Sequence, residues 1–304
     1  MLLLPLLAAA WLTLSAGCAR ERHQTVRLAN RVPTREVAQT SPDRPRLRVA
    51  LAGIVSPSEG IASYDDLLRY LEARLDLSAT VISGRSYAET NRLLRIGEVD
   101  MAIVCTYAYV RGHDEFGLRL LAAPQVSGQV RYRSYIIVPA DSRAASLSDL
   151  RGRRFAFTDP LSLTGRIYPM AMLSRQGLDP DTFFGSVVYT HNHDSSVRTV
   201  AEGLADGAAV DSLVYDTLVA GDASIGESTK IIEQSSLFCS PPVVVRPDLP
   251  ADRVDQLQQV LLSMHKDAKG REALAKIGIE RFALVADSDY DSVRALAEEV
   301  AERL

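Results

Sequence analysis

A hydroxyl-rich turn, Asp159-Pro160-Leu161-Ser162-Leu163-Thr164-Gly165, is the part of this sequence best suited to hold a small ion. It follows a predicted strand at residues 154–158 and precedes a helix predicted from about Arg166. The first N–H groups of a helix lack internal partners, and the helix dipole places positive potential there. Ser162 and Thr164 add two hydroxyl donors, and Gly165 lets the backbone approach closely. The turn predicts an anion site, and taken alone it leaves open an ordinary helix cap.

Enzyme and metal chemistry find less support in the sequence. The segment His191-x-His193-Asp194 has the spacing of metal ligands, but no third ligand cluster stands elsewhere, so we predict no metal site. The chain has no Gly-x-Ser-x-Gly elbow, Walker A loop or Gly-x-Gly-x-x-Gly fingerprint, and nothing pairs a nucleophile with a base. We therefore predict a binding protein without a cofactor rather than an enzyme, with a hydrolase as a distant alternative.

The N-terminal residues predict export. An apolar run at residues 2–16 is too short for a membrane span and suits a signal peptide, and Leu14-Ser15-Ala16-Gly17-Cys18 resembles a bacterial lipobox. We predict a lipoprotein signal peptide at 1–17, then lipidated Cys18 and a polar, flexible tether through residue 46. A plain secretory signal with an incidental cysteine is the alternative. The expected location is the periplasmic or extracellular face of the cell envelope, with the lipid anchor on a membrane surface.

The remaining chain, about 260 residues, is expected to form two lobes. Predicted strands at 47–52, 80–82 and 100–104 alternate with helices after capping boxes at Ser63 and Ser86, which indicates parallel, helix-flanked sheets. A second unit follows, with strands expected at 134–139, 154–158, 186–189, 208–210 and 230–232, and residues 243–245 are expected to cross back. We assign 47–134 plus 241–304 to lobe 1 and 135–240 to lobe 2, with the ligand in the cleft between them.

From about Leu47 to Leu284 the chain resembles the PhnD-type phosphonate, phosphate and phosphite-binding proteins, which are type II periplasmic solute-binding proteins. The segments that carry the resemblance are Leu93–Val110, Ser148–Gly152, Asp159–Pro169, His193–Asp211 and Pro241–Val243. The resemblance implies an α/β Venus-flytrap fold, capture of a small anion by hinge closure, and transfer to an ABC permease or a sensor kinase. The formal net charge of −4 argues against a nucleic-acid partner.

The resemblance also implies site residues. The family's oxyanion is held by the turn, which corresponds here to Ser162, Thr164, Gly165 and the backbone N–H of Leu163. Leu163 stands where the family usually has another hydroxyl, so one side-chain donor is missing. A ligand-facing histidine corresponds to His193. The closing residues of the second lobe correspond to Asp211, with a helix cap as the alternative, and Tyr215. Those of the first lobe correspond to Thr106, Tyr107 and Tyr109, and one of the two tyrosines is expected to face the core.

Cys105 stands where many family members have glycine. In this respect the chain resembles the arsenite-sensing proteins of the AioX type, so we include Cys105 among the candidate ligand-binding residues. A disulfide with Cys239, two buried structural thiols and a soft-ligand site remain alternatives. The first function hypothesis is an ABC transporter's binding lipoprotein for a phosphonate, phosphite or phosphate. The second is an oxyanion sensor, arsenite and arsenate included, that works with a histidine kinase.

Overall fold

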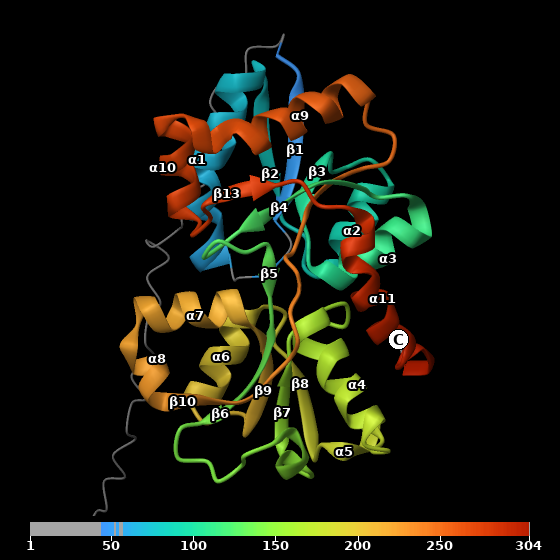
Figure 1. Cartoon of the computed structure of the whole chain (residues 1–304), viewed down its shortest axis with the longest axis vertical. Coiled ribbons are helices and arrows are strands. Elements are labelled where there is room, and N and C mark those ends of the chain that lie inside the picture. Colours follow the sequence, from blue (N-terminus) through green and yellow to red (C-terminus); the bar gives the residue numbers. More distant parts are fainter. Residues whose placement is uncertain (1–43, 52, 55–56, 304) are drawn as a thin grey trace, which may run out of the picture. The chain divides into compact units, whose positions relative to one another are not determined.

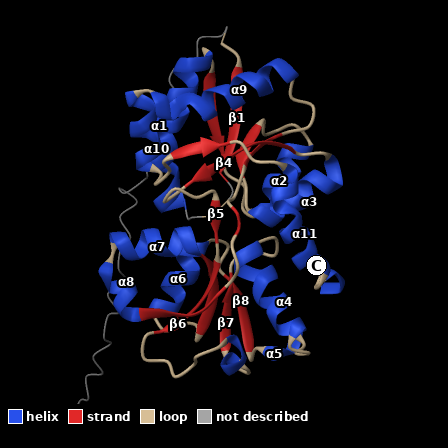
Figure 2. Ribbon diagram, viewed as in Figure 1, coloured by secondary structure: helices blue, strands red, loops and turns tan. Residues whose placement is uncertain are grey.

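The computed structural model describes residues 44–51, 53–54 and 57–303, and the side chains of 57–62 fall outside this description. The predicted signal peptide, Cys18 and nearly all of the predicted tether lie outside the described residues. All described residues belong to one structural unit, which contains two large β-sheets with helices packed against them (Figure 1, Figure 2). Among these residues no helix combines the length and the apolar character that a membrane crossing requires.

The first sheet has six strands in the order β13-β4-β12-β3-β1-β2. Strand β1 is parallel to β2 and β3, as predicted, whereas β12 is antiparallel to both of its neighbours because the chain returns from the second sheet. Its strands are β1 (Arg46–Leu51), β2 (Ser78–Ile82), β3 (Met101–Ile103), β4 (Arg119–Gln125), β12 (Val243–Val245) and β13 (Arg281–Ala283). Its helices are α1 (Pro57–Leu75), α2 (Tyr87–Arg95), α3 (Thr106–Phe116), α9 (Ala251–Ser263), α10 (Ala268–Lys276) and α11 (Asp291–Glu298).

Helix boundaries in this part follow local capping chemistry. The Ser86 hydroxyl accepts the Glu89 N–H and starts α2, and Gly97 takes the left-handed conformation (φ 72°) just after the helix ends, both as predicted. The prediction that Ser63 caps the first helix is wrong. Helix α1 begins at Pro57, a residue well suited to a first turn, and Ser63 lies inside the helix.

The second sheet has five strands in the order β10-β6-β9-β7-β8. Strand β7 is parallel to β8 and β9, and β6 is antiparallel to β9 and β10. The strands are β6 (Ser134–Pro139), β7 (Arg154–Phe157), β8 (Ser186–Tyr189), β9 (Gly207–Asp211) and β10 (Thr229–Gln234). The helices are η1 (Leu147–Leu150), η2 (Leu163–Ile167), α4 (Tyr168–Arg175), α5 (Pro180–Phe183), α6 (His193–Ala201), α7 (Ser212–Gly221) and α8 (Ala223–Ser228). Short 3₁₀ turns complete the C-terminal part, at η3 (Met264–Lys266), η4 (Asp287–Tyr290) and η5 (Ala301–Arg303).

A short antiparallel ribbon, β5 (Arg131–Tyr132) with β11 (Phe238–Cys239), lies where the chain passes between the two sheets (Figure 1). The sheets also meet through side chains, since one hydrophobic cluster contains buried residues of both. Two polar contacts join the same parts: the Tyr87 N–H donates to the Asp159 carboxylate (3.2 Å), and the His193 N–H donates to the Ile54 carbonyl (3.0 Å). The hydroxyl-rich turn therefore lies against the first sheet's helices.

Candidate functional site

The hydroxyl-rich turn is a π-helical turn, η2, joined directly to α4. Ser162 precedes it, and its hydroxyl accepts the Gly165 N–H at 3.0 Å. The backbone folds back so closely that a Cβ on Gly165 would lie 2.3 Å from the Thr158 hydroxyl and 2.9 Å from the Ser162 hydroxyl. Only glycine fits this position. The turn is thus a tight cradle of backbone and hydroxyl groups, as the sequence predicted, although the helix begins in π rather than α geometry.

Ser162 and Thr164 are fully buried. The Ser162 oxygen lies 3.0 Å from the Gly165 nitrogen and 3.3 Å from His193 Nε2. The Thr164 hydroxyl has no hydrogen-bond partner among the described residues. A buried hydroxyl without a partner costs about 1–3 kcal/mol, so its presence calls for a reason.

The neighbours of His193 fix its tautomer. The Asp211 N–H donates to His193 Nδ1 at 3.0 Å, so Nδ1 carries a lone pair and the ring proton sits on Nε2. The Nε2–H then donates to the Ser162 oxygen. Burial lowers the pKa of His193 to about 3, which keeps the ring neutral. With both lone pairs of Ser162 occupied by N–H donors, the Ser162 proton is free to be donated to a ligand. His193 therefore positions Ser162.

Asp211 ends β9 and caps α7: its carboxylate accepts the N–H groups of Leu213 (2.7 Å) and Val214 (3.3 Å). The cap interpretation left open by the sequence is therefore correct. Burial nonetheless raises the pKa of Asp211 to about 7, so this carboxyl exchanges a proton near neutral pH. Tyr215 is engaged elsewhere, because its hydroxyl is bonded to Thr229 at 2.9 Å and its ring packs edge-on against Tyr135.

The shifts of His193 and Asp211 act on stability in opposite directions. The unfolded chain protonates His193 below its ordinary pKa of 6.5, whereas the folded protein does so only near 3, so stability is lost as pH falls through that window. The folded protein keeps a proton on Asp211 that the unfolded chain releases above 3.8, so stability is lost as pH rises from 3.8 to about 7. Between pH 3.8 and 6.5 the two effects cancel.

The first-lobe candidates are placed less favourably than the resemblance implied. The Thr106 hydroxyl is bonded to the Tyr132 hydroxyl at 2.5 Å. The Tyr107 side chain is hydrogen-bonded to Arg111. Tyr109 donates to the Asp287 carboxylate at 2.6 Å. All three side chains thus have partners within the first lobe.

Cys105 lies against the turn. Its sulfur accepts hydrogen bonds from the backbone N–H groups of Leu163 and Tyr107, and burial raises the pKa of the thiol to about 12. The Leu163 amide that was expected to bind the anion is thus occupied by a neutral thiol. Cys105 and Cys239 are both free and buried, so the disulfide alternative is wrong for this structure. Among the described residues no group of His, Cys, Asp and Glu side chains could hold a metal ion.

Tyr87, the first residue of α2, was not predicted as a site residue. Its side chain is fully buried, and its hydroxyl has no hydrogen-bond partner in the described part of the chain. Burial, together with the nearby acidic groups of Cys105, Asp159 and Asp211, raises its pKa well above the ordinary value. The N-cap at Ser86 was the available signal, because it places Tyr87 at the start of a helix. The Tyr87 hydroxyl thus lacks a partner among the described residues, whereas those of Tyr107 and Tyr109 are bonded to Arg111 and Asp287.

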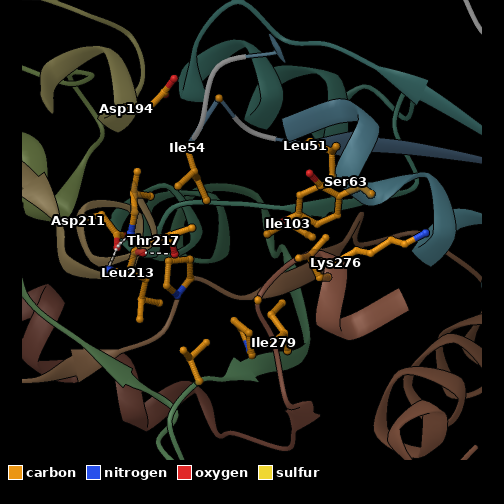
Figure 3. A pocket seen from close by; sticks show the side chains of 18 of the residues that line it. Leu51, Ile54, Ser63, Ile103, Asp194, Asp211, Leu213, Thr217, Lys276 and Ile279 are labelled. Carbon is orange, nitrogen blue, oxygen red and sulfur yellow. Dashed lines mark hydrogen bonds between the residues drawn. The ribbon is translucent and has the colours of Figure 1, made fainter. Parts of the chain in front are cut away.

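The buried side chains of Ser162, Thr164 and His193 form what we call the hydroxyl cluster. A cavity of ≈ 370 Å³ lies beside this cluster. Asp194 and Asp211 line it, but Ser162, Thr164 and His193 do not, and most of its other lining side chains are apolar (Figure 3). The hydroxyl cluster is therefore closed in this structure, and Asp211 lies between it and the cavity.

A family model described as the periplasmic substrate-binding protein of phosphonate ABC transporters matches residues 50–290. The chain is 28% identical to the phosphate-import protein PhnD of Mycolicibacterium smegmatis over 254 residues, which are 77% of this chain and 79% of that relative. These comparisons give no support to the sensor alternative.

Two solved structures share the fold. One is a binding protein component of an ABC phosphonate transporter from Pseudomonas aeruginosa, with a TM-score of 0.79, 20% identity, and coverage of 84% of this chain and 86% of that one. The other is PhnD1 of Prochlorococcus marinus in complex with methylphosphonate, with a TM-score of 0.77, 17% identity, and coverage of 84% and 98%. The predicted two-lobed fold of the type II periplasmic binding proteins is confirmed.

Proposed function

Because the chain belongs to the periplasmic substrate-binding proteins of phosphonate ABC transporters, we propose that it captures a small phosphorus oxyanion (a phosphonate, phosphate or phosphite) and delivers it to an ABC permease. The observation that carries the proposal is a set of buried donors without acceptors. Thr164 and Tyr87 have no partner among the described residues, and both acceptor positions of Ser162 are taken. An oxyanion supplies the missing acceptors.

The donor set suits an anion held by dipoles rather than by a counterion. The hydroxyls of Ser162, Thr164 and Tyr87 would donate to the phosphorus group. The backbone N–H groups of Leu163 and Gly165 are already bonded to Cys105 and Ser162. The neutral state of His193 matters here, because it makes the ring a donor to Ser162 and frees the serine proton.

Asp211 would select the protonation state of the ligand. A carboxyl with a pKa near 7 can accept a proton from a P–OH group or keep its own, and it repels a fully ionised oxyanion. We propose that the site favours a monoanionic form.

Thr106, Tyr107, Tyr109 and Tyr215 stay secondary candidates, since binding through their hydroxyls would require them to leave present partners. Delivery would use closure of the two lobes about the β5–β11 ribbon, with the protein anchored to the membrane through acylated Cys18.

A thermal-shift screen with phosphate, phosphite and methylphosphonate tests the proposal. A ligand that binds only the folded protein raises the melting temperature by mass action, by an amount that grows with ligand concentration. Sulfate serves as the control for general salt effects. No shift beyond that of sulfate with any of the three phosphorus anions at millimolar concentration would refute the proposed ligand class.

A further inference from the structure

The cavity beside the hydroxyl cluster has two apolar walls. One is α7, whose residues Leu213, Val214, Thr217 and Leu218 face it. These positions recur at i, i+1, i+4 and i+5, which is one face of a helix. The other wall comes from the first sheet, where Leu51 and Ile103 stand at the carboxyl ends of β1 and β3 and Phe282 lies on β13 (Figure 3).

The charged groups at the cavity are few and largely engaged. Lys276 has its ammonium group bound by the Asp66 carboxylate on α1, and its side chain extends away from the cavity in Figure 3. Asp194 and Asp211 also line the cavity. Asp194 is almost fully buried and has an interaction partner. Asp211, whose pKa burial raises to about 7, already caps α7 through its carboxylate. Such a lining offers little to a second charged group.

Asp211 contacts both the cavity and the hydroxyl cluster. Its side chain lines the cavity, while its N–H bonds His193, which in turn bonds Ser162. A substituent that extends from an anion at the Ser162 turn past Asp211 would enter this cavity. At ≈ 370 Å³ the cavity falls in the range of sites for small organic molecules, about 300–1,000 Å³. It is more than a bare oxyanion or a methyl group needs.

We propose that the ligand is an organic phosphonate or phosphate monoester with an apolar substituent of several carbons, alkyl or aryl, and that this cavity holds the substituent. The inference rests on the proposed function, since it takes the phosphorus group to bind at the Ser162 turn. Each buried methylene strengthens binding about fourfold by its transfer from water.

Isothermal titration calorimetry of the purified protein with phosphate and with methyl-, propyl-, hexyl- and phenylphosphonate tests the inference. Affinity is expected to rise about fourfold per added methylene from methyl to propyl and to remain high for hexyl and phenyl. The pair propylphosphonate and 2-aminoethylphosphonate, equal in chain length, tests polarity, and the propyl compound is expected to bind at least tenfold more tightly. Equal affinity across the alkyl series, or tighter binding of the aminoethyl compound, would overturn the inference.

Two tryptophan variants locate the effect. Thr217→Trp places a large ring from an exposed position of α7 into the cavity, whereas Ala220→Trp puts the same ring on the same helix at a position that does not line it. Thr217→Trp should weaken the binding of hexylphosphonate at least tenfold and that of methylphosphonate less than threefold. Ala220→Trp should change neither affinity. An undiminished hexyl affinity in folded Thr217→Trp would overturn the placement, and if that variant fails to fold, the wild-type series decides.

Different titration results would refute the proposed function and the inference about the apolar substituent. If phosphate and methylphosphonate bind without any gain from longer chains, only the apolar substituent is refuted. If no phosphorus compound in the series binds, both fall.

Discussion

The unpartnered hydroxyl of Thr164 leads to an unusual prediction. Thr164→Val should make the ligand-free protein more stable and should lower its affinity for the ligand. Valine keeps the shape of threonine and replaces the hydroxyl with a methyl group. In the free protein the hydroxyl is buried without a partner among the described residues, which costs about 1–3 kcal/mol. Removing it should raise the melting temperature by at least about 2 °C.

The effect on affinity should have the opposite sign. A hydrogen bond from a hydroxyl to a charged oxygen contributes about 1.5–3 kcal/mol, so losing it should weaken oxyanion binding roughly 10- to 150-fold. Tyr87→Phe should behave in the same way, because its hydroxyl is also buried and unpartnered among the described residues. Melting curves without ligand and calorimetric titrations of phosphate and methylphosphonate give the two quantities.

Thr229→Val is the matched control. Thr229 is equally buried, but its hydroxyl donates to the Ile225 carbonyl (2.7 Å) and is bonded to Tyr215 (2.9 Å). This variant should lower the melting temperature by a few degrees and leave affinity within about twofold. If Thr164→Val instead lowers the melting temperature and leaves affinity unchanged, Thr164 is a structural residue and the assignment of the donor cluster is wrong.

Three further predictions concern the carboxyl of Asp211, the thiol of Cys105 and the proposed lipid anchor at Cys18. In urea unfolding, the difference between wild type and Asp211→Asn isolates the Asp211 proton from the other shifted carboxyls. As pH falls below 6.5, Asp211→Asn should lose about 1.4 kcal/mol of stability per pH unit relative to wild type, because the variant lacks the proton uptake that offsets His193; parallel profiles of the two proteins would contradict the assigned shifts. Cys105→Ser should bind phosphorus oxyanions within about threefold of wild type, because a hydroxyl can accept the Leu163 N–H in place of the sulfur, and a tenfold loss would assign the sulfur to the ligand. Wild-type protein from cells should partition into detergent and Cys18→Ser into the aqueous phase, whereas equal partitioning would remove support for the anchor.

Much of the fold could be predicted because its signals are local. The Ser86 cap, the left-handed Gly97 and the strands at 186–189 and 243–245 were all placed correctly from short sequence patterns. The start of α1 was missed, since Ser63 offered a plausible capping box inside a helix that begins at Pro57. Capping patterns indicate where a helix can start, and tertiary packing decides how far it extends.

The side-chain partners within the site could not be predicted from the sequence. Tyr109 bonds Asp287, 178 positions away along the chain, and this long-range contact engages a hydroxyl that appeared available for ligand. Tyr87 was overlooked for the converse reason, because it reaches the turn only through the contact of α2 with Asp159. The resemblance pointed to the turn at residues 159–165, whereas the tyrosine that lies beside this turn depends on how the two sheets meet.

The central claim is that a phosphorus oxyanion binds at the Ser162 turn. Isothermal titration of methylphosphonate and phosphate into the wild-type protein and into the double variant Ser162→Ala, Thr164→Ala tests it most directly. We expect saturable binding to the wild type and a loss of roughly a hundredfold or more in the double variant, which should stay folded because a lost cap costs only about 1 kcal/mol. Wild-type affinity in the folded double variant would show that the anion binds elsewhere.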